Sequence, residues 1–248
     1  MSVRDAWTQD RAAFGAWLTF PSAHAAEMVA AMGFDYVCID WQHGMHGMSD
    51  VVSMLQILSR MPPTVLVRVP TNDPMWTGKV LDAGAHGVIV PMVNSREEAE
   101  LAASGCRFPP DGVRSFGSPR PHQPLGRGPA EQNASVLCFP MIETRQALAT
   151  ADEICTTPGI DGVYIGPSDL GISLGHSPTL DPTERDHVDA IETIRAACER
   201  AGIVAGIQCR DGAQAKARAD EGFRLVTAVS DAGLLATGAI TELGHARA

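Results

Sequence analysis

The chain has 248 residues, of which 45% are hydrophobic, and its formal net charge is −10. The length is close to the roughly 250 residues of a single (β/α)8 barrel, and the apolar fraction suffices for a large core. The acidic balance and the lack of a basic run argue against nucleic acid and anionic membranes as partners. Residues 1–5 carry charges instead of a signal-peptide apolar segment, and no stretch approaches the ~18 apolar residues of a membrane span, so we expect a cytoplasmic protein.

Six cysteines lie at positions 38, 106, 138, 155, 198 and 209, and no two of them have C-x-x-C spacing. Most of them sit inside apolar runs, where a thiol behaves as a small core residue in a reducing compartment. We therefore assign them no chemistry.

Short apolar runs recur along the chain, and segments with helix signals separate them. Buried parallel strands read as such runs, and eight of them alternating with helices predict one closed (β/α)8 barrel, or TIM barrel, over residues 1–248. A doubly wound sheet is the alternative, but the glycine fingerprint that usually follows its first strand is absent. The expected strands are 14–20, 36–40, 64–68, 87–90, 136–141, 162–165, 203–207 and 224–229. The expected helices include 51–60, 75–83, 96–103 and 183–201.

One connection, residues 106–135, is much longer than the others and is crowded with proline, glycine and arginine. A long loop in a compact domain is usually functional, and the alternative is a disordered flap. We expect a functional loop.

Polar residues gather at the ends of the expected strands, which is where (β/α)8 barrels keep their active sites. The second expected strand ends at Asp40 and is followed by Gln42, His43 and Gly44. Asp40 and His43 are therefore site candidates, and the alternative is a solvated turn with a helix-capping aspartate.

Two carboxylates follow neighbouring expected strands, Glu143 after the fifth and Asp169 after the sixth. About 5 Å apart in a sheet, they repel each other unless a cation lies between them. Oxygen ligands without a cysteine pair or paired histidines favour a hard ion, Mg²⁺ or Mn²⁺, over Zn²⁺, with Co²⁺ a further candidate. The alternative is that Glu143 caps a helix beginning near Thr144 and that Asp169 caps a turn.

Arg68 ends the third expected strand, and the barrel geometry aims its guanidinium over the mouth, where a fixed cation suits an anionic intermediate or a carboxylate. The alternative is an ion pair with Asp82 or another acid on the rim. The chain has only two lysines, Lys79 and Lys216, and both fall inside expected helices. A Schiff-base aldolase needs its amine at the mouth of the barrel, so imine catalysis is excluded.

Six blocks in order resemble the HpcH/HpaI family of metal-dependent pyruvate aldolases, over nearly the whole chain. They are GFD at 33–35 leading into IDWQHG at 39–44, VRVP at 67–70, LDAGAHGVIVP at 81–91, PPDGVRSFG at 109–117, MIET at 141–144 and IGPSDL at 165–170. The resemblance implies reversible cleavage of a 4-hydroxy-2-oxo acid into pyruvate or hydroxypyruvate and an aldehyde. Apart from the resemblance, we expect the 106–135 loop to shape the aldehyde end of the site.

The resemblance also implies roles for single residues. Glu143 and Asp169 would hold the divalent metal, which would bind the carboxylate and keto oxygens of the 2-oxo acid. His43 would be the acid/base, and its partner would be Asp82 by position, with Asp40 as the alternative.

Other residues would contact the substrate. Arg68 would face the keto oxygen, and the amides of Ser168 and Asp169 would face the substrate carboxylate. Trp17 and Gln42 complete the expected contacts. Family members commonly carry Glu where this chain has Gln42, so one negative charge beside the base is missing.

The resemblance further implies a homotrimer or homohexamer in which the last helix, beginning near Asp231, packs on a neighbouring subunit. Small molecules, a 2-oxo acid and an aldehyde, are the other expected partners. Three further readings compete with the aldolase: a CoA-ester lyase of the citrate-lyase-beta type, a sugar-phosphate isomerase barrel, and an inactive oligomeric relative, which the loss of charge at Gln42 prompts.

Overall fold

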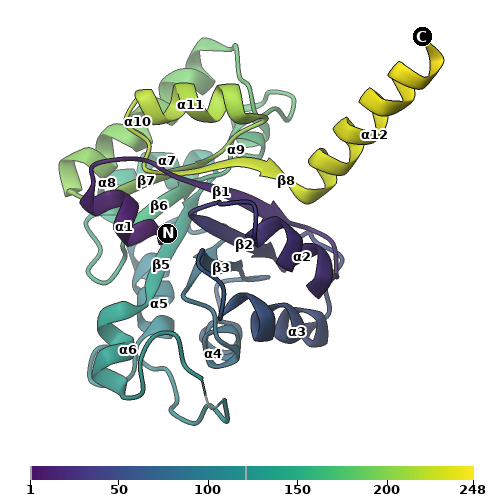
Figure 1. Cartoon of the computed structure of the whole chain (residues 1–248). Helices are drawn as coiled ribbons and strands as arrows, with labels where there is room; N and C mark the ends of the chain where they lie inside the picture. The colour runs from purple at the N-terminus through teal and green to yellow at the C-terminus, as the bar shows by residue number, and fades with distance from the viewer. Residues whose placement is uncertain (1, 121) are drawn as a thin grey trace.

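The computed structural model describes residues 2–120 and 122–248, and its centre is a closed parallel barrel (Figure 1). Its eight strands pair in chain order, and the last pairs with the first. They are β1 Ala13–Leu18, β2 Tyr36–Asp40, β3 Thr64–Arg68, β4 Gly87–Val90, β5 Leu137–Ile142, β6 Gly162–Ile165, β7 Val204–Gln208 and β8 Leu225–Ser230. The predicted (β/α)8 barrel is confirmed. β2, β3, β4 and β6 have the predicted bounds, and β1 ends at Leu18, before the predicted Phe20.

Helices follow the strands and surround the barrel (Figure 1). Those between the strands are α2 Ala23–Ala30, α3 Met48–Leu58, α4 Pro74–Ala83, α5 Arg96–Cys106, α6 Pro129–Ser135, α7 Arg145–Ala149, α8 Ala151–Cys155, α9 Pro167–Leu174, α10 Arg185–Ala201 and α11 Gly212–Asp220. Two more stand at the ends of the chain, α1 Val3–Thr8 and α12 Asp231–Arg247. No helix in residues 2–120 or 122–248 is long and apolar enough to cross a membrane.

The apolar core has two layers, as alternation along each strand requires. One layer lies between strands and helices and includes Val37, Ile39, Val65 and Val67. The other fills the barrel interior and includes large side chains such as Trp17, Tyr36, Phe139 and Tyr164, with Val3 and Ala6 of α1 packed against it. All six cysteines are free and buried, as predicted from their apolar surroundings.

The strand register places the polar strand ends beside one another. Asp40 of β2 is paired directly with Arg68 of β3. Ile142 of β5 is paired with Ile165 of β6, so that Glu143 and Gly166 leave the sheet side by side. The barrel thus places Asp40 beside Arg68 and Glu143 beside Gly166 at its C-terminal end.

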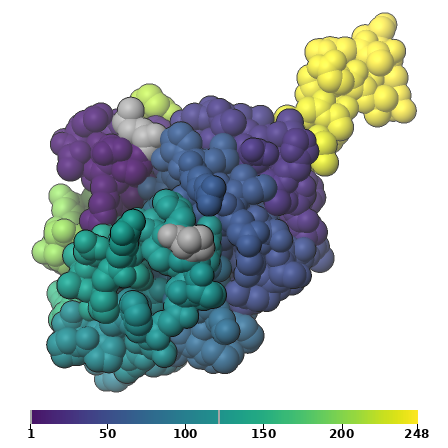
Figure 2. All heavy atoms as spheres, turned by 60° about the horizontal axis from the view of Figure 1, so that its bottom comes forward, coloured from purple at the N-terminus to yellow at the C-terminus, as the bar shows by residue number. Residues whose placement is uncertain are grey.

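The C-terminal helix does not join this compact body. α12 projects away from the barrel (Figures 1 and 2), and every residue from Gly233 onward is exposed. Four large apolar side chains are therefore open to solvent: Leu234, Leu235, Ile240 and Leu243.

Candidate active site

A pocket of about 200 Å³ opens at the C-terminal ends of the strands. We call it the mouth pocket. Five of the predicted site residues line it, namely Trp17, His43, Arg68, Ser168 and Asp169. Its other lining residues are Met141, Tyr164, Gly166, Pro167, Leu180 and Gln208.

One side of the mouth pocket carries a buried ion pair between Asp40 and Arg68. The guanidinium holds both carboxylate oxygens, with Nε to Oδ1 at 2.9 Å and Nη2 to Oδ2 at 2.6 Å. The Trp17 indole N–H donates to Oδ2 at 3.0 Å, and the guanidinium lies 5.2 Å from the centre of the Trp17 ring. Burial alone raises the pKa of Asp40, but the hydrogen bonds and charge of Arg68 outweigh it and hold that pKa below its ordinary value. Arg68 therefore does form an ion pair with an acid, as the alternative proposed, but this acid is Asp40 and not Asp82. Its Nη1 has no hydrogen bond to the described residues and lies at the mouth pocket.

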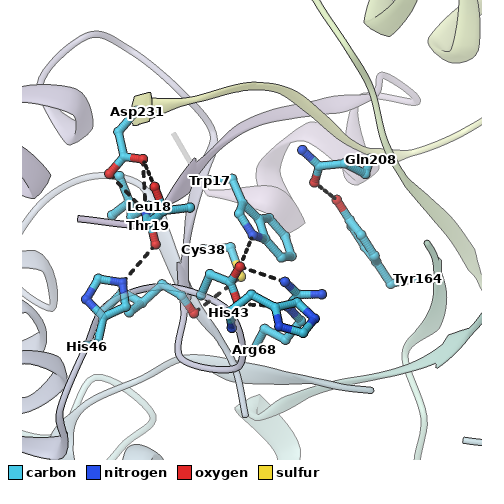
Figure 3. A network of polar contacts seen from close by, with 12 residues as sticks. Trp17, Leu18, Thr19, Cys38, His43, His46, Arg68, Tyr164, Gln208 and Asp231 are labelled. Atoms are coloured by element: carbon cyan, nitrogen blue, oxygen red, sulfur yellow. Dashed lines mark hydrogen bonds and ion pairs between the residues drawn. The ribbon is translucent and has the colours of Figure 1, made fainter. Parts of the chain in front are cut away.

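His43 lies in the loop that follows β2, and backbone hydrogen bonds hold this loop in place (Figure 3). The His43 N–H donates to Asp40 Oδ1 at 3.1 Å. The Gly44 N–H donates to the Asp40 carbonyl at 2.9 Å, and a Cβ at Gly44 would lie 2.3 Å from that oxygen. His46 Nε2 lies 3.1 Å from the Leu18 carbonyl. The His43 imidazole itself is exposed at the pocket and has no hydrogen-bond partner in the described residues.

The structure does not bring Asp82 to His43 within one chain. Asp82 lies in α4, and its carboxylate forms an ion pair with Arg114 at 2.8 Å. Together with residues of the long connection, Asp82 lines a second pocket of about 250 Å³. The described part of residues 106–135 lines that second pocket and contributes no residue to the mouth pocket. Within one chain, the aldehyde end is therefore not shaped by this connection.

Glu143 is buried on the other side of the barrel mouth, behind the lining residue Gly166, and does not itself line the mouth pocket. Its side chain does not cap a helix, because Thr144 caps α7. Oε1 accepts the Met92 N–H at 2.8 Å, while Oε2 lies against Gly166, where a Cβ would be 2.6 Å away. Burial is the main cause that raises the pKa of Glu143 to about 7, and the negative charge of Asp169 adds to it.

The first turn of α9 supplies hydrogen-bond donors next to this carboxylate. Gly166 is the N-cap, Pro167 follows it, and Ser168 and Asp169 are the next two residues. The backbone N–H groups of Ser168 and Asp169 have no acceptor in the described residues. Free N–H groups and the helix dipole favour an anion here, and both residues line the mouth pocket.

Glu143 and Asp169 fit a divalent cation. Burial and the charge of Asp169 raise the pKa of Glu143 despite the opposing charge of Arg68, and a cation between the two carboxylates would relieve both effects. Within residues 2–120 and 122–248, no group of three or more His, Cys, Asp or Glu side chains has the arrangement of a metal site. The pair would therefore supply two oxygen ligands and leave the other positions to water or substrate, as hard cations commonly require.

Sequence reasoning missed some pocket residues and included four that are not among the lining residues: Asp40, Gln42, Asp82 and Glu143. Tyr164 was expected only as a position within a strand, and Gln208 only as the residue that follows a strand. Leu180 lies in an irregular connection without a motif. The inward alternation along β6 was the one available signal for Tyr164. Gln42 is not among the lining residues, and its Oε1 is buried without a hydrogen bond. Neither Lys79 nor Lys216 lines the mouth pocket.

Comparison with known proteins agrees with this geometry. The chain is 42% identical over 247 residues to a hydroxypyruvate/pyruvate aldolase of Rhizorhabdus wittichii, covering 99% of this chain and 98% of the relative. It is 36% identical over 244 residues to a 4-hydroxy-2-oxo-heptane-1,7-dioate aldolase of Klebsiella pneumoniae, covering 96% and 91%. A solved structure of an HpcH/HpaI aldolase/citrate lyase family protein from Burkholderia cenocepacia is 31% identical, covers 96% of both chains and superposes with a TM-score of 0.87.

The family model for HpcH/HpaI aldolase/citrate lyase matches residues 13–237, from the start of β1 into α12. This match includes every strand and every predicted site residue. The chain belongs to the HpcH/HpaI aldolase/citrate lyase family.

Proposed function

We propose that the protein is a divalent-metal-dependent aldolase that reversibly cleaves 4-hydroxy-2-oxo acids into pyruvate or hydroxypyruvate and an aldehyde. One observation supports this proposal above the others. Around a single pocket stand a clamped guanidinium, a like-charged carboxylate pair and the free N–H groups of a helix N-terminus. These are the groups needed to bind a 2-oxo acid and to stabilise an enolate.

The substrate carboxylate is bound at the N-terminus of α9, by the N–H groups of Ser168 and Asp169. Arg68 directs Nη1 to the keto oxygen, because Asp40 occupies Nε and Nη2. Negative charge grows on that oxygen when the carbon–carbon bond breaks, so a fixed donor there acts mainly on the transition state. Trp17 holds Asp40 from the other side and provides an apolar wall.

His43 is the acid/base of the reaction. In cleavage it accepts the proton of the C4 hydroxyl, directly or through water, as the C3–C4 bond breaks and the aldehyde forms. The electron pair of the broken bond becomes the enolate, which takes a proton at C3 to give the 2-oxo acid. The exposure of the imidazole at the pocket suits a proton transfer to solvent.

Glu143 and Asp169 would hold the cation, with Mg²⁺ or Mn²⁺ favoured by the oxygen ligands. When bound, it supplies positive charge next to the keto and carboxylate oxygens of the substrate. Gln42 does not line the pocket. A glutamate at this position would therefore place its negative charge outside direct contact with the substrate.

The experiment that tests this function is a panel assay of pyruvate and hydroxypyruvate with several aldehydes, with Mg²⁺, Mn²⁺ or a chelator present. Metal-dependent formation and cleavage of hydroxy-oxo acids is the expected result. In a parallel sample, borohydride and pyruvate should leave the mass of the protein unchanged, because no lysine lines the pocket. A pyruvyl adduct on Lys79 or Lys216, or activity that persists without metal, would contradict the proposal.

We also propose a cytoplasmic homotrimer or homohexamer in which α12 packs on a neighbouring subunit. The exposed Leu234, Leu235, Ile240 and Leu243 support a partner for this helix. The position of Asp82 gives a second reason, since an Asp82–His43 pair can form only between two chains. Six free cysteines fit a reducing compartment. The mass in solution, measured by light scattering, should be three or six times that of one chain.

A further inference from the structure

Gln208 and Tyr164 form a polar corner of the mouth pocket that the proposed chemistry does not use. Gln208 is the last residue of β7, and Tyr164 lies on the neighbouring strand β6. Both line the pocket, and the Tyr164 hydroxyl donates to Gln208 Oε1 at 3.0 Å. Trp17 lies between this corner and Arg68 (Figure 3), so the corner faces a part of the substrate other than the keto oxygen.

A chain of hydroxyl groups through the barrel interior determines which end of the Gln208 amide faces the pocket. Tyr36 Oη lies 2.7 Å from Thr227 Oγ1, which lies 2.5 Å from Tyr164 Oη. Only one direction gives each of the three hydroxyl protons an acceptor within these contacts: Tyr36 donates to Thr227, Thr227 donates to Tyr164, and Tyr164 donates to Gln208 Oε1. With the opposite polarity, the buried Tyr36 proton would lose Thr227 as its acceptor, at the cost of an unsatisfied donor.

The two tyrosines of this chain keep their hydroxyl protons. Burial raises the pKa values of Tyr36 and Tyr164 well above the ordinary tyrosine value. The Tyr164 ring is stacked on Trp17, with ring centres 5.4 Å apart, and its Cδ2 lies so close to Gly206 that a Cβ there would be 2.9 Å away. The hydroxyl that fixes Gln208 Oε1 is therefore itself fixed.

The Nε2 group of Gln208 is left as a free donor. It has no hydrogen bond to the described residues, and Gln208 is only partly buried at the pocket. Its neighbours in the pocket include the apolar Leu180 and Met141. A substrate oxygen at this corner gains a hydrogen bond, whereas a methyl or methylene group there leaves the amide unpaired.

We propose that Gln208 is a specificity-determining residue that donates from Nε2 to a hydroxyl on the carbon next to a reacting carbonyl. This hydroxyl is either that of hydroxypyruvate or that of a 2-hydroxyaldehyde. The inference rests on the proposed aldolase function and names the substrate class for the same pocket. Tyr164 acts as the positioning residue, because it holds Oε1 and so directs Nε2.

The experiment compares four reactions of the full-length protein with Mn²⁺: pyruvate or hydroxypyruvate, each with acetaldehyde or glycolaldehyde. The quantity measured is the ratio of kcat/KM with the hydroxyl to kcat/KM without it, for the oxo acid and for the aldehyde separately. Gln208→Met keeps the length of the side chain and removes the donor. Gln9→Met, an exposed position at the end of α1 away from the pocket, is the matched control.

The expected result for Gln208→Met is a fall of about five- to tenfold in one of the two ratios, the value of one neutral hydrogen bond. The ratio that falls identifies the source of the hydroxyl. Tyr164→Phe should lower the same ratio by a smaller factor, because the donor remains but is no longer directed. Gln9→Met should leave both ratios at the wild-type value.

Two results would overturn the inference. Both ratios in Gln208→Met could stay within twofold of wild type, or Tyr164→Phe could leave intact the ratio that Gln208→Met lowers. Failure of the aldolase proposal can be distinguished from failure of this inference, because wild type would then give no product in any of the four reactions. Calorimetric binding of hydroxypyruvate and pyruvate to wild type and Gln208→Met would then test the oxo acid without turnover, and binding of glycolaldehyde and acetaldehyde would test the aldehyde, each through the ratio of the two dissociation constants.

Discussion

The two sides of the mouth pocket present carboxylates in opposite electrostatic environments. On the β2–β3 side, Asp40 meets the guanidinium of Arg68 in a bidentate pair, and its pKa is lowered. On the β5–β6 side, buried Glu143 meets the like charge of Asp169, and its pKa is raised to about 7. The first side is complete within the chain and positions a donor. The second side carries two like charges, which the proposed divalent cation would neutralise.

Breaking the β5–β6 side should have the largest effect. We expect chelation, Glu143→Gln and Asp169→Asn each to abolish turnover, because the positive charge that stabilises the enolate is lost in all three. Apo Asp169→Asn should be no less stable than apo wild type, since the substitution removes a repulsive charge. Metal should raise the Tm of wild type only. The measurement is thermal unfolding of both proteins with and without Mn²⁺, and equal metal-induced shifts would show that the ion binds elsewhere.

The next largest effect is expected for the acid/base, which belongs to neither carboxylate pair. His43→Ala should lower kcat by roughly 10²–10⁴, the range of general acid/base catalysis. Its metal affinity should stay close to that of wild type, because the imidazole has no place in the Glu143–Asp169 pair. Steady-state kinetics and a Mn²⁺ titration measure the two quantities. Loss of metal affinity together with activity would make His43 a ligand.

A smaller effect is expected when the geometry of the β2–β3 side is altered and its charge is kept. Arg68→Lys retains one positive charge but not the planar fork that Asp40 holds at two positions. We expect kcat/KM to fall by about 10²–10³, as when one preorganised oxyanion donor is removed. Chemical denaturation should show that the free energy of unfolding falls by less than the activation free energy rises. An unchanged rate would reduce Arg68 to a structural partner of Asp40.

The sequence predicted the features of this pocket that depend on local pattern. Apolar runs gave the strands, and the rule that polar residues at strand ends meet at one mouth gave Arg68, His43, Ser168 and Asp169. It also gave the neighbouring positions of Glu143 and Asp169, because consecutive strands of such a barrel pair.

Features that depend on side-chain direction or on several strands at once were not predictable. Asp40 and Asp82 were both available to His43 and to Arg68, and only the β2–β3 register and the Arg114 pair separate them. The direction of the Gln208 amide depends on hydroxyls from three other strands. A single sequence also carries no information about what covers the exposed apolar side chains of α12.

The last prediction concerns the support beneath the β2–β3 side. His86, just before β4, accepts the Val65 N–H of β3 at its Nδ1, at 3.0 Å. Burial is the main cause that lowers the pKa of His86 to about 4, and nearby His122 adds to it. Nδ1 can accept the Val65 N–H only while it is unprotonated. The folded state therefore binds this proton less readily than the unfolded state, whose histidine titrates near 6.5. The stabilising contribution is full above about pH 6.5 and is lost as the pH falls towards 4, by up to about 3 kcal/mol.

His86→Asn tests this dependence, because the Asn Oδ1 can accept the Val65 N–H in place of Nδ1 and does not titrate. Denaturant unfolding of wild type and His86→Asn at pH 7.5, 6, 5 and 4.5 gives the free energy of unfolding for each. We expect wild type to lose more stability than the variant over this range, and the difference between them to change little above pH 7. Because His86 contacts the backbone of β3 and not the mouth pocket, kcat at pH 7.5 should be alike in the two proteins. Parallel curves at every pH would show that His86 is equally free to protonate in the folded and unfolded states, and that the β2–β3 side does not depend on its neutral form.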